Sequence, residues 1–151
     1  MTTFKNVDEV LDFAIKAEED AHDFYMGLSK KVEKPWMQKA LVDFAREEAG
    51  HKAKLLKIKE GKTLVPAETK VLNLKLAEYI ADVKPSLDMN YEQALVVAMK
   101  NEKMAYKLYM NLAQVVDDEN VRNAFLALAQ EEAKHKLQFE TEYDDYVFQE
   151  D

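Results

Sequence analysis

The sequence predicts an all-α protein, an antiparallel four-helix bundle with one long crossover between its second and third helices. Its 151 residues include only three Gly and three Pro, which favours long uninterrupted helices over turn-rich β structure. In four segments, apolar residues recur in alternating steps of four and three, as in a helix packed inside a bundle. The row of residues at this spacing in each segment is here called its seam. The first two segments are also repeated in the last two.

Residues typical of helix ends mark where the first two expected helices begin and end. Asn6 and Glu9 form a capping box before a helix expected over residues 7–33, Pro35 suits the first turn of the second helix, and Gly61 suits its C-cap. The first seam runs Val7, Leu11, Ala14, Glu18, Ala21, Tyr25, Leu28 and Val32. The second seam runs Met37, Leu41, Phe44, Glu48, His51, Leu55 and Ile58.

Residues 61–89 break this spacing. Pro66 and Pro85 bracket a stretch over 70–82 that we expect to include a short helix. The whole segment is long enough to run back along a bundle, so it is interpreted as the crossover.

The second half of the chain repeats the first. Sliding 6–57 onto 90–141, an offset of 84, pairs 17 identical residues in 52 positions, and Asn90 with Gln93 repeats the first cap. The third seam runs Tyr91, Leu95, Ala98, Glu102, Ala105, Tyr109, Leu112 and Val116, and the fourth Val121, Phe125, Leu128, Glu132, His135 and Phe139. We expect a single domain over 1–151 that contains an internal duplication, with 142–151 as a short, frayed extension of the last helix.

Composition excludes several classes of protein. The net charge of −8 argues against a nucleic-acid partner. The absence of cysteine excludes disulfides, zinc ribbons, iron–sulfur clusters and thiol catalysis. No secretory signal and no apolar window of about 18 residues are visible, so we expect a cytoplasmic protein that does not enter a membrane.

Six ionisable residues occupy seam positions, which should be buried: Glu18, Glu48, His51, Glu102, Glu132 and His135. Buried carboxylates are costly unless they are paired or bind metal, and the seams contain no Lys or Arg. Each Glu-x-x-His pair lies on one helix face, one turn apart. One such pair is usually a solvated surface pair, but two at matched seam positions predict a centre for two divalent cations.

Other residues near these positions have more than one interpretation. Tyr25 and Tyr109 are either core aromatics whose hydroxyls need a partner or donors that hold a ligand carboxylate. Glu47 and Glu131 fall outside the seam and are expected on the surface more than behind the ligands, and so is His22. The paired Met26 and Met110 are expected to serve packing, because carboxylates favour hard metals.

Four carboxylates and two imidazoles favour iron or manganese over copper, and zinc could use the same atoms. We favour two iron ions because iron gives the centre a redox role.

The order Glu, Glu-x-x-His, Glu, Glu-x-x-His resembles the ferritin-like di-iron carboxylate proteins, particularly their rubrerythrin branch, over about residues 6–141. The resemblance implies that the six seam residues are the iron ligands and that Tyr25 hydrogen-bonds a ligand carboxylate. It also implies a homodimer, whose interface could include off-seam Phe13, Phe24 and Trp36 or the tail aromatics Tyr143, Tyr146 and Phe148.

The chain also departs from its relatives. It has no cysteines for a rubredoxin domain, so the electron donor is expected to be a separate protein. The extra glutamate of rubrerythrins, three residues after the third-helix Glu, is Ala105 here. Ala49 and Gly50 replace the haem-binding Met of bacterioferritin, and the fifth helix of ferritin cages is missing.

We therefore expect an oxidoreductase that reacts with O2 or hydrogen peroxide, with rubrerythrin-like peroxidase or ferroxidase activity. An iron- or manganese-binding or storage protein without turnover is the first alternative. A structural bundle that holds zinc or no metal is the second.

Overall fold

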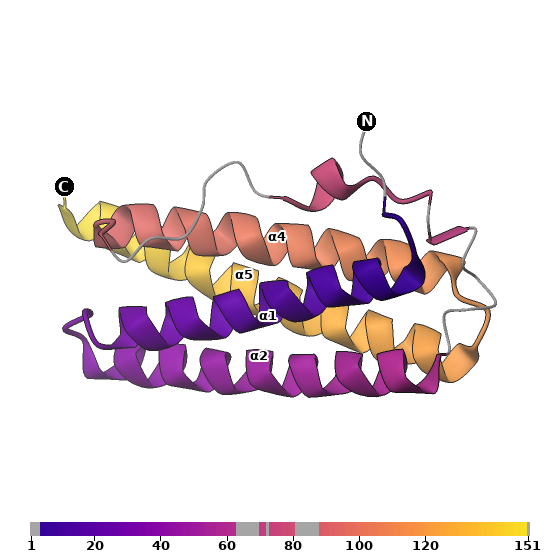
Figure 1. Ribbon diagram of the computed structural model, residues 1–151. Coiled ribbons are helices and arrows are strands. Elements are labelled where there is room, and N and C mark those ends of the chain that lie inside the picture. Colours follow the sequence, from indigo (N-terminus) through magenta and orange to yellow (C-terminus); the bar gives the residue numbers. More distant parts are fainter. Residues whose placement is uncertain (1–3, 63–69, 72, 81–87, 151) are drawn as a thin grey trace.

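The computed structural model describes residues 4–62, 70–71, 73–80 and 88–150. These residues form four long helices and one 3-10 turn, so the predicted all-α bundle is confirmed (Figure 1). In chain order the elements are α1 (Val7–Ser29), α2 (Pro35–Gly61), η2 (Leu76–Tyr79), α4 (Tyr91–Val115) and α5 (Glu119–Glu150).

The helices are arranged as two antiparallel hairpins. Most close contacts between elements lie within the α1–α2 pair and the α4–α5 pair. Helix α2 ends at one end of the bundle and α4 begins at the other, so the connection between them spans its length, as predicted (Figure 1). The described part of this crossover includes η2, which contacts α4.

The expected short helix of the crossover is described only in part. Residues 70–71 are helical, and the 3-10 turn Leu76–Tyr79 follows. The bracketing Pro66 and Pro85, and positions 72, 81 and 82, lie outside the described residues.

Side-chain caps begin α1 and α4. Asn6 Oδ1 accepts the Glu9 amide at 2.8 Å, and Asn90 with Gln93 forms a complete capping box. Helix α2 begins at Pro35, as expected, and ends at Gly61, after which Lys62 adopts a left-handed conformation with φ of 54°. These caps satisfy backbone groups that would otherwise lack partners at the helix ends.

One predicted boundary was wrong and another was confirmed. Helix α1 ends at Ser29 and not at residue 33, because the residue before Pro35 must be extended and the short connection leaves no room for another turn. Helix α5 continues to Glu150, so the residues after 141 extend the last helix, as expected. Glu142 explains part of this: it is buried and accepts the Tyr91 hydroxyl at 2.9 Å, which ties the extension to α4.

The apolar core consists of two clusters at opposite ends of the bundle. One contains Tyr25 and Phe139, and the other contains Tyr109 and Phe125. Met26 and Met110 pack against the two clusters, as expected for gap-filling side chains. The six ionisable seam residues belong to neither cluster, although all six are buried.

The off-seam aromatics are not equally accessible. Trp36 is 57% exposed and Phe148 75% exposed, whereas Phe24 is buried in the core and is not available to a partner. Tyr146 packs edge-on against Tyr91. None of the helices in the described part of the chain is long and apolar enough to span a membrane.

Candidate metal centre

The structure brings all six predicted ligand residues together in the middle of the bundle. Each of the four long helices contributes at least one: Glu18 from α1, Glu48 and His51 from α2, Glu102 from α4, and Glu132 and His135 from α5. The three-residue spacing places the Glu and His of α2, and those of α5, on one inward face.

Among the described residues, the six form two overlapping groups of four. Glu18, Glu48, His51 and Glu132 make one group, and Glu48, Glu102, Glu132 and His135 make the other. Within each group the candidate ligand atoms all lie within 4.8 Å of one another. Glu48 and Glu132 belong to both groups, which is the arrangement that two metal ions with shared carboxylates require.

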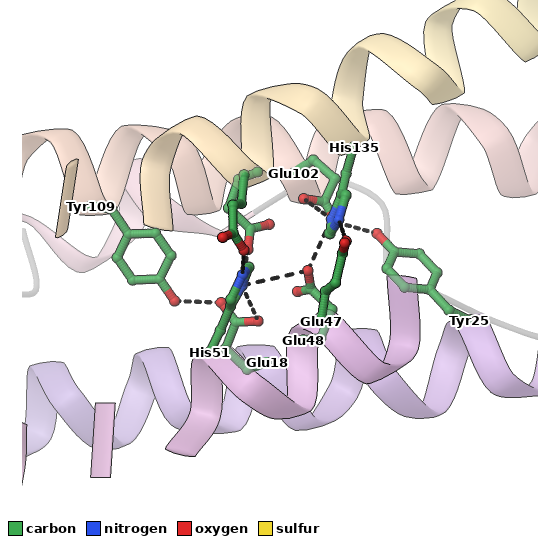
Figure 2. Close-up of polar contacts among 10 residues, drawn as sticks. Glu18, Tyr25, Glu47, Glu48, His51, Glu102, Tyr109 and His135 are labelled. Atoms are coloured by element: carbon green, nitrogen blue, oxygen red, sulfur yellow. Dashed lines mark hydrogen bonds and ion pairs between the residues drawn. The ribbon is translucent and has the colours of Figure 1, made fainter. Parts of the chain in front are cut away.

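The two imidazoles face the carboxylates through Nδ1. His51 Nδ1 lies 2.7 Å from Glu132 Oε1 and 3.5 Å from Glu18 Oε2. His135 Nδ1 lies 3.0 Å from Glu48 Oε1 and 3.6 Å from Glu102 Oε2 (Figure 2). Each Nδ1 is therefore the ring nitrogen that is placed to bind metal.

The outer nitrogen of each imidazole contacts a carboxylate from the opposite hairpin. Nε2 of His51 contacts Glu131, and Nε2 of His135 contacts Glu47. A carboxylate at Nε2 favours the tautomer that carries its proton on that nitrogen, which is the tautomer that would present Nδ1 to a metal.

Glu47 and Glu131 were expected mainly on the surface, and they are 52% and 39% exposed. Their carboxylates nevertheless reach inward to the imidazoles. Their repetition immediately before Glu48 and Glu132 was the one feature of the sequence that could have indicated a role at the site. The contacts themselves join different helices, and the spacing of residues along one helix does not reveal such contacts. His22, by contrast, interacts with the neighbouring Asp23 at the surface.

The two buried tyrosines belong to the apolar clusters and also hydrogen-bond candidate ligand carboxylates, so the two interpretations of these residues hold together. The Tyr25 hydroxyl donates to Glu102, and the Tyr109 hydroxyl donates to Glu18 (Figure 2). Both hydrogen bonds run between α1 and α4, so each tyrosine orients a carboxylate from the other half of the chain.

Several buried atoms of the centre lack a hydrogen-bond partner among the described residues. They are Glu18 Oε2, Glu48 Oε1, Glu102 Oε2, Glu132 Oε2 and His135 Nδ1. His135 Nδ1 and Glu48 Oε1 are close, but their geometry is not that of a hydrogen bond. One unpaired oxygen on every carboxylate, in a site with no Lys or Arg among its groups, is the pattern that hard divalent cations satisfy.

Without metal, the carboxyl and imidazole groups of this cluster have shifted pKa values, because their charges are buried close together. Burial and the neighbouring carboxylates raise the pKa values of Glu48 and Glu132 well above the ordinary range. Burial lowers the pKa values of His51 and His135, but adjacent carboxylates outweigh it and raise both. Burial acts to raise the pKa of Glu18, yet hydrogen bonds from its neighbours leave it lowered.

The tyrosine hydroxyls stay protonated in this setting. Burial, followed by the charge of the carboxylate that each contacts, raises the pKa values of Tyr25 and Tyr109 well above 10.0. Both phenols can therefore donate to the ligand carboxylates at any ordinary pH.

The antiparallel bundle, its long crossover and the shared-carboxylate cluster define the class of ferritin-like di-iron carboxylate proteins. Within that class, the chain belongs to the rubrerythrin family, whose sequence profile matches residues 9–143.

Solved structures agree with the fold. A Thermotoga maritima protein, provisionally classed as a ferritin-like diiron-carboxylate protein, superposes with a TM-score of 0.79 at 19% identity, covering 97% of this chain and 99% of that one. A hypothetical protein from Pyrococcus furiosus superposes with a TM-score of 0.70 at 27% identity, covering 89% and 86%. No curated protein matches the sequence.

Proposed function

We propose that the protein is a di-iron carboxylate oxidoreductase that reacts with O2 or hydrogen peroxide. The observation that carries the proposal is the pair of overlapping ligand groups, in which every buried carboxylate has an oxygen without a partner. Bound iron would supply a ferrous–ferric couple and positions at which a small oxidant can bind.

The residues of the chain take separate roles in this proposal. Glu48 and Glu132 would help to hold both ions, because they alone belong to both groups. Glu18 and His51 would complete the set of ligands for one ion. Glu102 and His135 would complete the set for the other ion. Iron fits these hard oxygen and imidazole donors, and manganese or zinc could use the same atoms.

The surrounding residues would hold the ligands in place. The hydroxyls of Tyr25 and Tyr109 donate to Glu102 and Glu18, which limits how these carboxylates can rotate. Glu47 and Glu131 keep the imidazoles oriented through Nε2. The 151 residues contain no cysteine, so reducing equivalents would come from a separate donor protein.

Elemental analysis of protein purified without added metal is the first test, and two irons per chain are expected. The iron-loaded protein is then reduced without oxygen and mixed rapidly with O2 or with hydrogen peroxide. Repeated consumption of one oxidant, followed through the absorbance of the centre, would support the proposal. Indifference of the reduced centre to both oxidants would contradict it.

Ala105 favours a second candidate, metal binding or storage without turnover. It stands where the resemblance leads one to expect a further glutamate, and it leaves the ligand set symmetric between the halves. This candidate predicts stoichiometric uptake and release of iron or manganese with no catalytic consumption of oxidant, so the same mixing experiment separates the two.

A further inference from the structure

A groove of about 350 Å³ lies between the start of α2 and the end of α5, which are at the same end of the bundle (Figure 1). Its volume falls within the range of small-molecule binding sites. Trp36 and Phe44 line it from α2, and Leu137, Glu142 and Asp145 line it from α5. Its lining, among the described residues, contains no candidate metal ligand. The groove, here called the α2–α5 groove, is therefore distinct from the metal centre.

The α2–α5 groove combines apolar walls with negative charge. The ionisable residues of its described lining are both acids, Glu142 and Asp145, and no Lys, Arg or His belongs to that lining. Asp145 is exposed, whereas Glu142 is only 3% exposed. A buried carboxylate is costly unless a cation or hydrogen-bond donors compensate it. The groove therefore favours an occupant that carries a positive charge on an apolar body.

The fold itself requires neither this acid nor the tryptophan. The offset of 84 matches Glu142 with Ile58, a buried apolar residue of α2, and it matches Trp36 with Asn120. The corresponding positions of the other half are thus filled without a carboxylate and without an aromatic ring. Packing of the bundle therefore does not account for the acidic and aromatic groups of the groove.

The Lys34 side chain shows that an ammonium group fits beside these residues. Its Nζ lies 3.4 Å from Glu142 Oε1 and 5.5 Å from the centre of the Trp36 ring, and both groups attract a cation. The Tyr91 hydroxyl donates to the same Glu142 oxygen at 2.9 Å, which holds the carboxylate in position. The Lys34 contact is long for a charge-assisted hydrogen bond, and its side chain is 37% exposed, so another ammonium group can take its place.

We propose that the α2–α5 groove is a binding site for a protonated alkylamine, whose ammonium group replaces that of Lys34 beside Glu142 and the Trp36 ring. The hydrocarbon chain of the amine lies along the apolar wall that includes Phe44 and Leu137. Leu137 is 63% exposed, so covering it with a hydrocarbon chain is favourable. The inference is independent of the proposed function, because it involves no candidate metal ligand and no redox step.

The test uses the fluorescence of Trp36, which is the only tryptophan in the 151 residues and therefore reports on the groove directly. Hexylammonium is titrated into the protein as purified at neutral pH. The neutral 1-hexanol and the anionic hexanoate, of equal chain length, are the control ligands. We expect a saturable change with hexylammonium and an affinity for either control that is lower on the order of tenfold or more, because only the ammonium pairs with the carboxylate.

Three variants locate the binding. Glu142→Gln keeps the shape of the side chain without its charge, and it should lower the affinity for hexylammonium on the order of tenfold. Lys34→Gln removes the competing ammonium at a partly exposed position, and it should raise the same affinity severalfold. Asp144→Asn removes a negative charge from an exposed position of α5 outside the lining, so it is the matched control and should bind as the unmodified chain does. Circular dichroism checks that each variant is folded.

Equal affinities for hexylammonium and 1-hexanol would overturn the inference. An affinity for hexylammonium that is unchanged in both Glu142→Gln and Lys34→Gln, or lowered equally in Asp144→Asn, would also overturn it. Tighter binding of Nα-acetyllysine methylamide than of hexylammonium would assign the groove to a lysine of a partner protein and overturn the assignment to a free amine. None of these measurements depends on metal content or turnover, so their outcome is separate from that of the proposed function.

Discussion

The two halves of the chain have the same candidate metal ligands but differ in the packing around them. Tyr25 lies among three phenylalanines, with ring centroids 5.9 Å from Phe24, 6.2 Å from Phe44 and 5.3 Å from Phe139. Tyr109, at the matching position, has only Phe125 as an aromatic ring neighbour among the described residues, at 6.3 Å. The chemistry of the centre is duplicated, whereas its apolar surroundings are not.

The difference follows a simple exchange of residue types at matched positions. Phe24, Phe44 and Phe139 correspond to Leu108, Leu128 and Leu55, and Phe125 corresponds to Leu41. Phe44 lies 4.6 Å from the His135 ring, ring centre to ring centre. Apolar packing needs only the right total volume, whereas metal ligands need particular atoms. The two candidate ion positions therefore have the same donor groups but different apolar neighbours.

Removing the ligand pair of either half should have the largest effect. Glu132→Ala with His135→Ala, and Glu48→Ala with His51→Ala, each delete a carboxylate shared by both groups. We expect both ions to be lost in either variant, measured by elemental analysis after dialysis, with circular dichroism to show that the helices persist. One tightly retained ion per chain would show that the carboxylates are not shared.

Raising the pH should destabilise the metal-free protein and stabilise the loaded one. The raised pKa values of Glu48 and Glu132 mean that their protonated forms stabilise the fold, an effect lost as pH rises above the ordinary value of 4.5. His51 and His135 act in the same direction, because the stabilisation present below 6.5 is lost as pH rises through their raised values. Metal binding requires deprotonated ligands, so it reverses the trend.

Thermal unfolding between about pH 5 and pH 8, with chelator and with iron, checks this expectation. Glu48→Gln and Glu132→Gln should each weaken the pH dependence of the metal-free protein, because the two residues occupy matching positions of the repeat and both have raised pKa values. A metal-free protein that gains stability over this range would contradict the sign.

Replacing the outer carboxylates should weaken metal binding without abolishing it. Glu47→Gln and Glu131→Gln remove the charge that holds each imidazole, which typically lowers metal affinity about 10–100-fold. Glu131 is the less exposed of the two, so its loss should be the more costly. Competition with a metal-binding dye measures the affinity, and Glu60→Gln, an exposed position on α2, serves as control.

Replacing an aromatic neighbour of the centre by an aliphatic one should alter the difference in metal affinity between the two candidate ion positions. Phe44→Leu copies the residue of the other half and removes the ring beside His135. It should lower the free energy of unfolding by about 1–2 kcal/mol and bring the affinities of the two ions closer together. Calorimetric titration resolves the two binding steps; a wider separation between them would count against a role for this ring.

The smallest expected effect is a gain in stability at Gly50. The matching residue is Lys134, Gly50 is exposed within α2, and a Cβ there would meet nothing within 4 Å. Gly50→Ala should therefore raise the free energy of unfolding by about 0.5–1 kcal/mol, measured by urea denaturation. Lys134→Gly should lower it by a similar amount, and a loss at Gly50 would point to an unseen contact.

Much of the fold could be predicted because it depends on local rules. The seam spacing located the helices, and Asn6, Pro35, Asn90 and Gly61 located ends within a residue or two. The ligand residues could be located because charged residues in a seam are unusual. All six lie together in the structure, although their role as ligands stays a prediction.

The rest depended on contacts across the bundle, which periodicity does not encode. The inward reach of Glu47 and Glu131 is one case, since a residue beside a seam can contact either solvent or the next helix. The Glu142–Tyr91 contact that ties the end of α5 to α4 is another, because it joins distant parts of the chain. Phe24 was misjudged for the same reason.

Contacts between the two halves have a consequence for assembly. Tyr25 with Glu102, Tyr109 with Glu18, and the two imidazole–carboxylate contacts all join one hairpin to the other. A hairpin separated from the other keeps three of the four candidate ligands of one group. It keeps none of these contacts between the hairpins. If the site binds metal as proposed, uptake would be coupled to docking of the hairpins, because each complete group needs residues from both.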